Sequence, residues 1–278
     1  MLANLNDVLP KAQKEGYAVG LFNTIDSDML QAAIEAAEEN RSAIIIGTAE
    51  VLLPYGELSL IGPGLIAAAK NASVPVVVNF DHGLSFDRCL EAMKVGFTSI
   101  MFDGSANDYE TNLANTREMV KIAHSLGVSV EGEIGHVGLA ATGDNASSDM
   151  YTTPEEAWTF VHETGIDAVA VAIGTAHGAY KVKPKLDIQR LAEIRRRVDT
   201  PLVLHGGSGL SDDDFRNTIK NGIAKVNIFT DLCHMGDRAV KLGMDAGLSY
   251  LDLRNLKKDA IKMEITKKMK LFGSCQRY

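Results

Sequence analysis

Three histidines of this chain stand at the ends of apolar segments that have strand composition. His82 follows VPVVVNFD, His177 follows AVAVAIGTA and His205 follows PLVL. Imidazole is a common protein ligand for divalent metals, and three protein ligands with one open position are typical of a catalytic zinc site. Asp81 directly precedes the first histidine and can transfer protons beside a metal. The pattern predicts a catalytic metal site with an acid–base group next to it.

A glycine-rich loop follows the third histidine. It reads GGSG at residues 206–209, and the segment NIFT occupies 227–230. Glycines let backbone N–H groups approach an anion closely, and Ser208 and Thr230 add hydroxyl donors. For either segment alone, a plain tight turn is the alternative. Because a metal ligand precedes the glycines directly, we predict that the two segments bind a phosphate group of the substrate.

The chain alternates between short apolar segments and longer amphipathic ones. The apolar segments are rich in Val and Ile and mostly continuous, which is typical of parallel strands buried on both faces. We expect strands at residues 18–23, 43–48, 74–81, 99–104, 128–135, 168–174, 201–207 and 224–230. Helical spacing and capping residues predict helices at 26–40, 87–95, 107–126, 154–163, 188–198, 212–221, 231–246 and 251–269.

Eight strands that are each followed by a helix predict a (β/α)8 barrel, the TIM barrel of the α/β class. No Pro-rich linker or change of composition divides the chain, so we expect residues 1–278 to form a single domain with an extra C-terminal helix. The alternative is an open doubly wound sheet with a glycine fingerprint after its first strand. The nearest match, at residues 62–67, follows a loop instead, and we interpret it as the start of a helix.

The composition of the chain limits the kinds of molecule that it is expected to bind. The net charge of −8 argues against general binding to nucleic acid or anionic membranes. No apolar run reaches the ~18 residues of a membrane span, and the N-terminus lacks the apolar core of a signal peptide. Cys89, Cys233 and Cys275 form no CxxC pair, which indicates reduced thiols. We therefore expect a cytoplasmic enzyme that acts on small molecules.

The carboxyl ends of parallel barrel strands meet at one rim, where such folds place their active sites. Polar residues collect at the predicted strand ends: Asn23, Thr48, Asp81, His82, Asp103, Glu131, Glu133, His177, His205, Asn227 and Thr230. His124, His162 and His234 lie in predicted helices and are interpreted as ordinary structural residues. We therefore expect one active site at this rim, and His136 is the histidine whose role stays open.

Four segments resemble the class II, zinc-dependent fructose- and tagatose-bisphosphate aldolase family. They are FDH at 80–82, GTAHGAYKVKPKLDIQRLAEI at 174–194, LHGGSGL at 204–210 and KVNIFT at 225–230. Their order and spacing match over nearly the whole chain and are most similar to the shorter, tagatose-type branch. The resemblance implies a lyase that acts in carbohydrate metabolism and forms homodimers or homotetramers.

The resemblance also assigns residues. It implies that His82, His177 and His205 hold one catalytic Zn²⁺, and that Asp81 is the catalytic aspartate. Asp103 and Glu133 match the positions of a second, accessory divalent or monovalent cation. Substrate contacts are implied for Thr48, Gly178, Lys181, Gly206, Gly207, Ser208, Asn227, Ile228, Phe229 and Thr230.

The implied chemistry suits these residue types. Cleavage of a ketose 1-phosphate between its third and fourth carbons leaves an enediolate, which needs a Lewis acid beside the ketone oxygen. A base must take the proton of the hydroxyl on the fourth carbon, and Asp81 is suited to that. The phosphate site would hold dihydroxyacetone phosphate as the donor.

The chain departs from the family on the acceptor side. Relatives carry acidic residues in the loop after the fifth strand, where this chain reads GLAATGDN at 138–145. Asp144 and Glu133 are the candidate replacements. Gly83 stands where several relatives have a histidine, and Phe229 replaces a smaller or acidic residue. Asn23 and Arg254 are candidates for contact with the acceptor, although an exposed helical arginine is an equal interpretation of Arg254.

The leading prediction is a zinc-dependent aldolase that makes or cleaves a ketose 1-phosphate or bisphosphate, with an unassigned aldehyde acceptor. The first alternative is a Schiff-base aldolase on the same fold, for which Lys225 and Lys181 are the nearest candidate nucleophiles. The second is a barrel that binds a sugar phosphate and has lost or redirected its turnover.

Overall fold

The computed structural model describes residues 1–135, 137–139, 151–178, 180 and 184–278. Parallel strands form a closed ring in the order β4-β3-β2-β11-β10-β8-β6-β5, and the pairing of β5 with β4 closes it. The ring strands are β2 (Val19–Asn23), β3 (Ile44–Ala49), β4 (Val76–Gly83), β5 (Ser99–Phe102), β6 (Ser129–Ile134), β8 (Ala168–Val171), β10 (Leu202–Leu204) and β11 (Ile223–Ile228). The predicted (β/α)8 barrel is confirmed.

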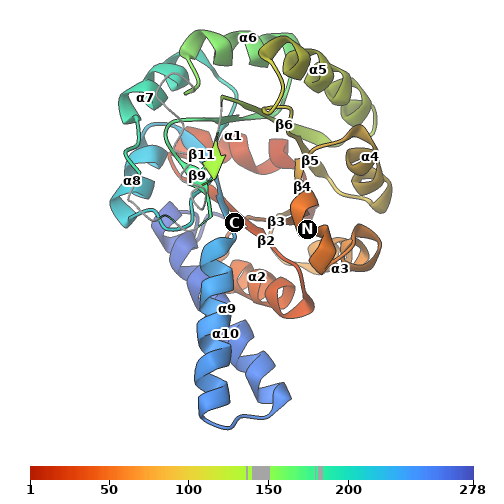
Figure 1. Cartoon of the computed structure of the whole chain (residues 1–278), viewed down its shortest axis with the longest axis vertical. Helices are drawn as coiled ribbons and strands as arrows, with labels where there is room; N and C mark the ends of the chain where they lie inside the picture. Colours follow the sequence, from red (N-terminus) through yellow and green to blue (C-terminus); the bar gives the residue numbers. More distant parts are fainter. Residues whose placement is uncertain (136, 140–150, 179, 181–183) are drawn as a thin grey trace.

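Helices surround the ring (Figure 1). They are α2 (Ser27–Glu39), α3 (Leu58–Asn71), α4 (Phe86–Val95), α5 (Tyr109–Ser125), α6 (Pro154–Thr164), α7 (Ile188–Arg197), α8 (Asp212–Lys220), α9 (Thr230–Asp245) and α10 (Tyr250–Phe272), with the 3₁₀ helix η1 (Glu50–Tyr55). Thr153 and Glu156 form a capping box at the start of α6, and Pro154 occupies its first turn. The extra C-terminal helix is α10, and it projects from the barrel together with α9 (Figure 1).

Helix α1 (Leu5–Glu15) closes the amino-terminal end of the barrel. Its buried residues Leu5, Val8 and Leu9 belong to the same apolar cluster as Val19 and Leu21 of β2. A second, larger cluster fills the space between the strands and the surrounding helices. An active site can therefore form only at the other end of the barrel, where the polar carboxyl ends of the strands lie.

Several elements differ from their predicted bounds. Four strands (β5, β8, β10 and β11) end two or three residues earlier than expected. Residues 62–67 do not start a helix but lie inside α3, which begins at Leu58 after the cap of Glu57. Strand β1 (Leu2–Ala3) pairs with the start of β4, and β7 (Gly138–Leu139) pairs with β9 (Ala176–His177). These short strands give no periodic signal in the sequence. Among the described residues, no helix is long and apolar enough to span a bilayer.

Candidate active site

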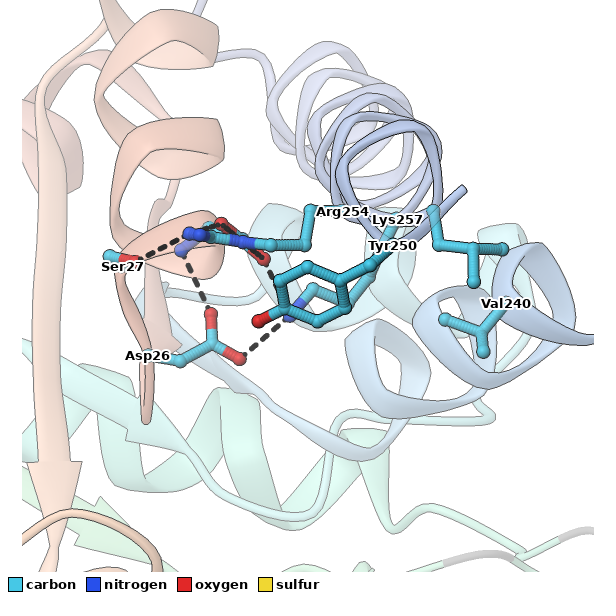
Figure 2. A pocket seen from close by; sticks show the side chains of 8 residues that line it. Asp26, Ser27, Val240, Tyr250, Arg254 and Lys257 are labelled. Atoms are coloured by element: carbon cyan, nitrogen blue, oxygen red, sulfur yellow. Dashed lines mark hydrogen bonds and ion pairs between the residues drawn. The ribbon is translucent and has the colours of Figure 1, made fainter. Parts of the chain in front are cut away.

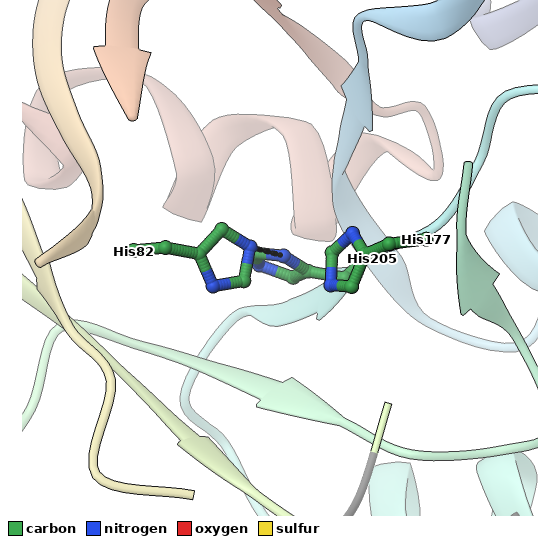
Figure 3. A group of neighbouring side chains, drawn as sticks. All are labelled: His82, His177 and His205. Carbon is green, nitrogen blue, oxygen red and sulfur yellow. Dashed lines mark hydrogen bonds between the residues drawn. The ribbon is translucent and has the colours of Figure 1, made fainter. Parts of the chain in front are cut away.

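Three histidine rings converge at the carboxyl-terminal end of the barrel (Figure 3). His82 is on β4, His177 ends β9 and His205 follows β10. One ring nitrogen of each lies within 4.8 Å of the others, and His82 Nε2 is 2.9 Å from His205 Nδ1. His82 has a φ of 44°, a left-handed backbone conformation that non-glycine residues rarely adopt and that is common at functional sites. The geometry brings the three predicted ligands together.

Two of the rings are oriented by carboxylates behind them. His82 Nδ1 lies 2.7 Å from Asp103 Oδ2, and His205 Nε2 lies 2.8 Å from Glu131 Oε1. A carboxylate accepts the proton on the outer nitrogen, so the inner nitrogen keeps its lone pair for a metal. Such carboxylate–histidine pairs are the usual support of zinc ligands, and the donor set therefore fits Zn²⁺.

The protonation of the rings fits the same site. Burial, with the positive charge of His82, lowers the pKa of His177 to about 4. Burial lowers the pKa of His205 well below its ordinary value. Although burial opposes it, the carboxylates of Asp81 and Asp103 raise the pKa of His82 to about 10. Two of the rings are thus neutral, and the surrounding carboxylates favour a positive charge at His82.

A second group of ligands adjoins the first. His82, Asp103 and Glu133 also offer atoms within 4.8 Å of one another. Glu133 is almost fully buried, and its Oε2 has no hydrogen-bond partner among the described residues. Burial and the charge of Asp103 raise the pKa of Glu133 well above its ordinary value. These are the residues that the sequence predicts for an accessory cation.

Asp81 is held between two amides. Asn23 Nδ2 donates to Asp81 Oδ2 at 2.8 Å, and Asn227 Nδ2 donates to Oδ1 at 3.0 Å. Burial favours the neutral acid, but the positive charges of His82 and Lys225 outweigh it and lower the pKa of Asp81. Asp81 is therefore an ionised, oriented carboxylate that can accept a proton.

The glycine-rich loop lies beside the start of α9. A Cβ on Gly206, which has a φ of 64°, would lie 2.4 Å from Ala176 O, and one on Gly207 would lie 2.9 Å from Asn227 O. Only glycine fits at these two positions. Helix α9 has no side-chain cap at Phe229, and the N–H groups of Phe229 and Asp231 point to Ser208 Oγ at 3.3 Å each. A helix N-terminus with this loop is suited to bind an anion.

These residues share one pocket of about 390 Å³. Its predicted members are Asn23, Asp81, His82, Asp103, Glu133, His177, Gly178, Gly206, Gly207, Ser208, Asn227, Ile228, Phe229 and Thr230. His205 lies beneath it, fully buried. The pocket also has an apolar side formed by Ala49, Val51, Leu52, Leu84, Ala106 and Val137.

Comparison with known proteins decides the family. Residues 3–277 match the family described as fructose-bisphosphate aldolase class-II. This chain belongs to the class II fructose-bisphosphate aldolase family. The fructose-bisphosphate aldolase of Thermus caldophilus is 39% identical over 307 aligned positions, which cover 100% of both chains.

Protein YdjI of Escherichia coli K12 is similar as well. It is 39% identical over 275 positions, which cover 99% of this chain and 98% of that one. The crystal structure described as the YdjI aldolase of E. coli K12 matches with a TM-score of 0.91 and 37% identity, covering 100% and 99% of the two chains. The fold comparison therefore agrees with the sequence comparison over the whole barrel.

Two predicted contacts of the class II site lie elsewhere. Thr48 is fully buried and shares the strand face of Ile44 and Ile46, which pack toward the helices. Side chains alternate along a strand, so its neighbour Ala49 lines the pocket instead, and the predicted substrate contact of Thr48 is wrong. Arg254 lies on α10, where it contacts Asp28 and lines a separate pocket of about 480 Å³ (Figure 2).

On the acceptor side of the site, packing explains one difference from the family pattern, the glycine at position 83. A Cβ on Gly83 would lie 2.4 Å from Cys89 Sγ and 3.0 Å from Met101 O, so the histidine of some relatives cannot fit. His136, Asp144, Lys181 and the loop 141–149 lie outside the described residues. Glu133, the other candidate for the missing loop acid, lines the pocket.

Sequence reasoning placed Glu131 at the rim without a role, named Lys225 only as a candidate nucleophile and did not identify the apolar side of the pocket. Glu131 and Lys225 are fully buried under the histidines, where Lys225 Nζ lies 2.8 Å from Glu131 Oε2. Lys225 is the third residue of β11, and its side chain reaches the Glu131 carboxylate and the Asn227 amide oxygen. The apolar side of the pocket could not be identified from the sequence, because Val and Leu residues in loops resemble residues of the hydrophobic core.

Proposed function

We propose that this chain is a zinc-dependent aldolase that reversibly cleaves a ketose 1-phosphate to dihydroxyacetone phosphate and an aldehyde. The observation that carries the proposal is the convergence of His82, His177 and His205 beside Asp81, with carboxylates behind two of the rings. Family membership over residues 3–277 supports an aldehyde-lyase reaction. Residues 1–278 would form one catalytic domain.

The histidines would hold one zinc ion through His82 Nε2, His205 Nδ1 and a ring nitrogen of His177. When bound, zinc supplies a Lewis acid that stabilises the negative charge that develops on the ketone oxygen. The chain's own part is to orient these rings, because Asp103 and Glu131 hold the outer nitrogens of His82 and His205 and leave the inner ones directed at the site. Asp103 and Glu133 would hold an accessory cation.

Asp81 would take the proton from the hydroxyl on the fourth carbon during cleavage and return it during condensation. The amides of Asn23 and Asn227 hold both carboxylate oxygens, so the base stays fixed while the substrate changes. Its lowered pKa keeps it ionised and ready to accept a proton at neutral pH.

The phosphate of the donor would bind where Gly206–Ser208 faces the N-terminus of α9. Backbone N–H groups and the Ser208 hydroxyl can donate to phosphate oxygens there, and Gly178 and Asn227–Thr230 line the same part of the pocket. The loop directly follows the metal ligand His205, so a phosphate bound there anchors the donor with its reacting carbons near the histidines.

The acceptor is an aldehyde without a distal phosphate. The described lining residues of the pocket include no lysine or arginine, and one side of the pocket is apolar. A ketose bisphosphate would need a second cationic site, and Arg254 is already paired with Asp28 in its own chain. The product of condensation is then a ketose 1-phosphate.

We also place the chain in the shorter, tagatose-type branch and expect a homodimer or homotetramer. The alignment with the Thermus caldophilus enzyme needs 307 positions for the 278 residues of this chain, so that relative has about 29 additional positions (307 − 278). The exposed apolar residues Leu242, Met244, Leu248, Tyr250 and Leu251 at the tip of the α9–α10 hairpin support contact with a second copy.

Metal removal tests the proposal. Retro-aldol cleavage of ketose 1-phosphates should disappear after treatment with a chelator and return with Zn²⁺. The variant His205→Ala should lose bound zinc and activity together. His162→Ala, in which the exposed ring contacts the Trp158 carbonyl, is the matched control and should keep both. Activity that survives complete metal removal would refute the proposal.

The two alternatives give different results. A Schiff-base aldolase would be trapped covalently by borohydride in the presence of dihydroxyacetone phosphate. We expect no adduct, because Lys225 does not line the pocket and its Nζ contacts Glu131. Tight binding of dihydroxyacetone phosphate with no product across a wide panel of aldehydes would indicate a sugar-phosphate-binding barrel.

A further inference from the structure

Lys225 is a fully buried lysine that the mechanism above does not use. It lies on β11 inside the barrel and is 0% exposed. Its Nζ lies 2.8 Å from Glu131 Oε2 and donates to Asn227 Oδ1 at 2.6 Å. An ammonium loses its hydration when it is buried, so it persists only where fixed partners replace the water. Here those two partners each lead to a different part of the active site.

The first partner leads to the metal ligand His205. Glu131 Oε2 faces Lys225, and its other oxygen, Oε1, faces His205 Nε2 at 2.8 Å. The ammonium therefore holds one carboxylate oxygen and turns the other toward the ring. Without it, Glu131 loses the contact that orients its carboxylate, and the ring loses a fixed support for presenting Nδ1.

The second partner leads to the base Asp81. An ammonium has only donors, so the atom of Asn227 that faces it must be the amide oxygen. The amide nitrogen must then face Asp81, where Nδ2 donates to Oδ1 at 3.0 Å. Lys225 thereby determines which way the Asn227 amide points. If the amide turned over, an oxygen would face the carboxylate and repel it.

We propose that Lys225 is a positioning residue that orients the metal ligand His205 through Glu131 and the base Asp81 through Asn227. It acts through these side chains and does not touch the substrate, since it does not line the pocket. The inference rests on the proposed aldolase function. It assigns a buried lysine of the barrel to alignment of the site, in place of the Schiff-base chemistry that its residue type suggests.

The first measurement is zinc affinity, which needs no substrate. In Lys225→Met the side chain keeps its length and loses its donors. We expect the dissociation constant for Zn²⁺, measured by competition with a chromogenic chelator, to rise about 10- to 100-fold, as it does when outer partners of metal ligands are removed. A fraction of unfolded protein would lower the zinc stoichiometry and leave this constant unchanged, so the constant separates positioning from loss of fold.

A matched control is Lys258→Met. Lys258 on α10 is a mostly buried lysine that pairs with Glu35 at 3.2 Å, away from the pocket. This variant should keep the wild-type zinc dissociation constant. If Lys225→Met does not fold, the double variant with Glu131→Gln removes both buried charges and serves in its place. A wild-type zinc dissociation constant in either folded Lys225 variant would overturn the proposal.

The second measurement tests the link to Asp81. With zinc at saturating concentration, we expect Lys225→Met to lower kcat at least 10-fold and to change the KM for the ketose 1-phosphate by less than about 3-fold. An unchanged kcat would overturn the link. A wild-type enzyme that turns over no ketose phosphate would refute the proposed function instead, and the zinc measurement would still report on Lys225.

Discussion

Arg254 on α10 binds Asp28, near the start of α2, through two guanidinium nitrogens. Arg254 Nη2 donates to Asp28 Oδ1 at 2.6 Å, and Nε lies 3.1 Å from Oδ1 and 3.2 Å from Oδ2. Lys257 Nζ lies 2.9 Å from Asp28 Oδ2, and it lies 2.9 Å from Asp26 Oδ2 as well (Figure 2). Asp28 thus balances two cations of α10, and this contact adds to the other ion pairs and the buried apolar residues that join the extra C-terminal helix to the barrel.

The Asp28 pair should stabilise the fold in a pH-dependent way. Hydrogen bonding to Arg254 is the main cause that lowers the pKa of Asp28, whereas its unfolded value is about 3.9. Its contribution is therefore fully present above about pH 4 and is lost as pH falls through the folded pKa. We expect Asp28→Asn to lower the free energy of unfolding by about 1–2 kcal/mol at pH 7.

Urea denaturation at several pH values measures this difference. The gap between the wild type and Asp28→Asn should shrink below about pH 4. Asp237→Asn is the control, because Asp237 pairs with Lys241 on the exposed surface and should change stability by less than about 0.5 kcal/mol. An equal gap at pH 3 and pH 7 would show that the ion pair does not account for the effect.

The same pair bears on substrate choice. A cation neutralised by Asp28 in its own chain has little charge left to attract a phosphate, and the described pocket lining has no lysine or arginine. In condensation with dihydroxyacetone phosphate, we expect kcat/KM for unphosphorylated aldehydes to exceed that for matched phosphorylated ones at least 10-fold. Arg254→Met should leave that ratio within about 3-fold of wild type. A ratio that changes 10-fold in this variant would show that Arg254 meets the acceptor, from its own or a neighbouring chain.

The sequence predicts the metal side of this site better than the acceptor side, for physical reasons. Parallel strands in a barrel must bring their carboxyl ends together, so histidines at three strand ends converge. The predicted substrate contact of Thr48 placed this residue on the wrong face of its strand. A shift of one residue along a strand reverses the direction of the side chain. The contacts of Lys225 could not be predicted for a related reason. They depend on how deep in the barrel β11 places this residue.

Contacts between distant segments are beyond a local pattern. Arg254 and Asp28 are separated by 226 positions, and nothing near either residue indicates the pair. The family resemblance names Arg254 as a candidate contact of the acceptor, but the packing of α10 against α2 determines which groups its guanidinium contacts. The apolar pocket side formed by Val51, Leu84 and Val137 depends in the same way on where loops fold over the barrel.

Asp81→Asn should separate proton transfer from metal binding. An asparagine there cannot accept the substrate proton, so we expect kcat to fall roughly 10²- to 10⁴-fold. Neither oxygen of Asp81 is hydrogen-bonded to a histidine in the described structure, so zinc content should stay at the wild-type level. Activity assays with parallel metal analysis measure both quantities. A variant that keeps more than a tenth of wild-type kcat would exclude Asp81 as the base.

Ser208→Ala should weaken binding of the donor through its phosphate. The hydroxyl lies between the glycine loop and the N–H groups at the start of α9. Loss of one hydrogen bond to a charged group costs about 1.5–3 kcal/mol, which predicts a KM for dihydroxyacetone phosphate about 10- to 100-fold higher. The change in kcat should be smaller, since the phosphate is remote from the reacting carbons.

Two controls make that measurement specific. With dihydroxyacetone, which lacks the phosphate, wild type and Ser208→Ala should differ by less than about 2-fold. Ser249→Ala removes the cap of α10, where Ser249 Oγ accepts from the Asp252 N–H, and should cost about 1 kcal/mol of stability with no change in KM. If Ser208→Ala instead weakens both donors equally, the hydroxyl supports the loop and the phosphate binds elsewhere in the pocket.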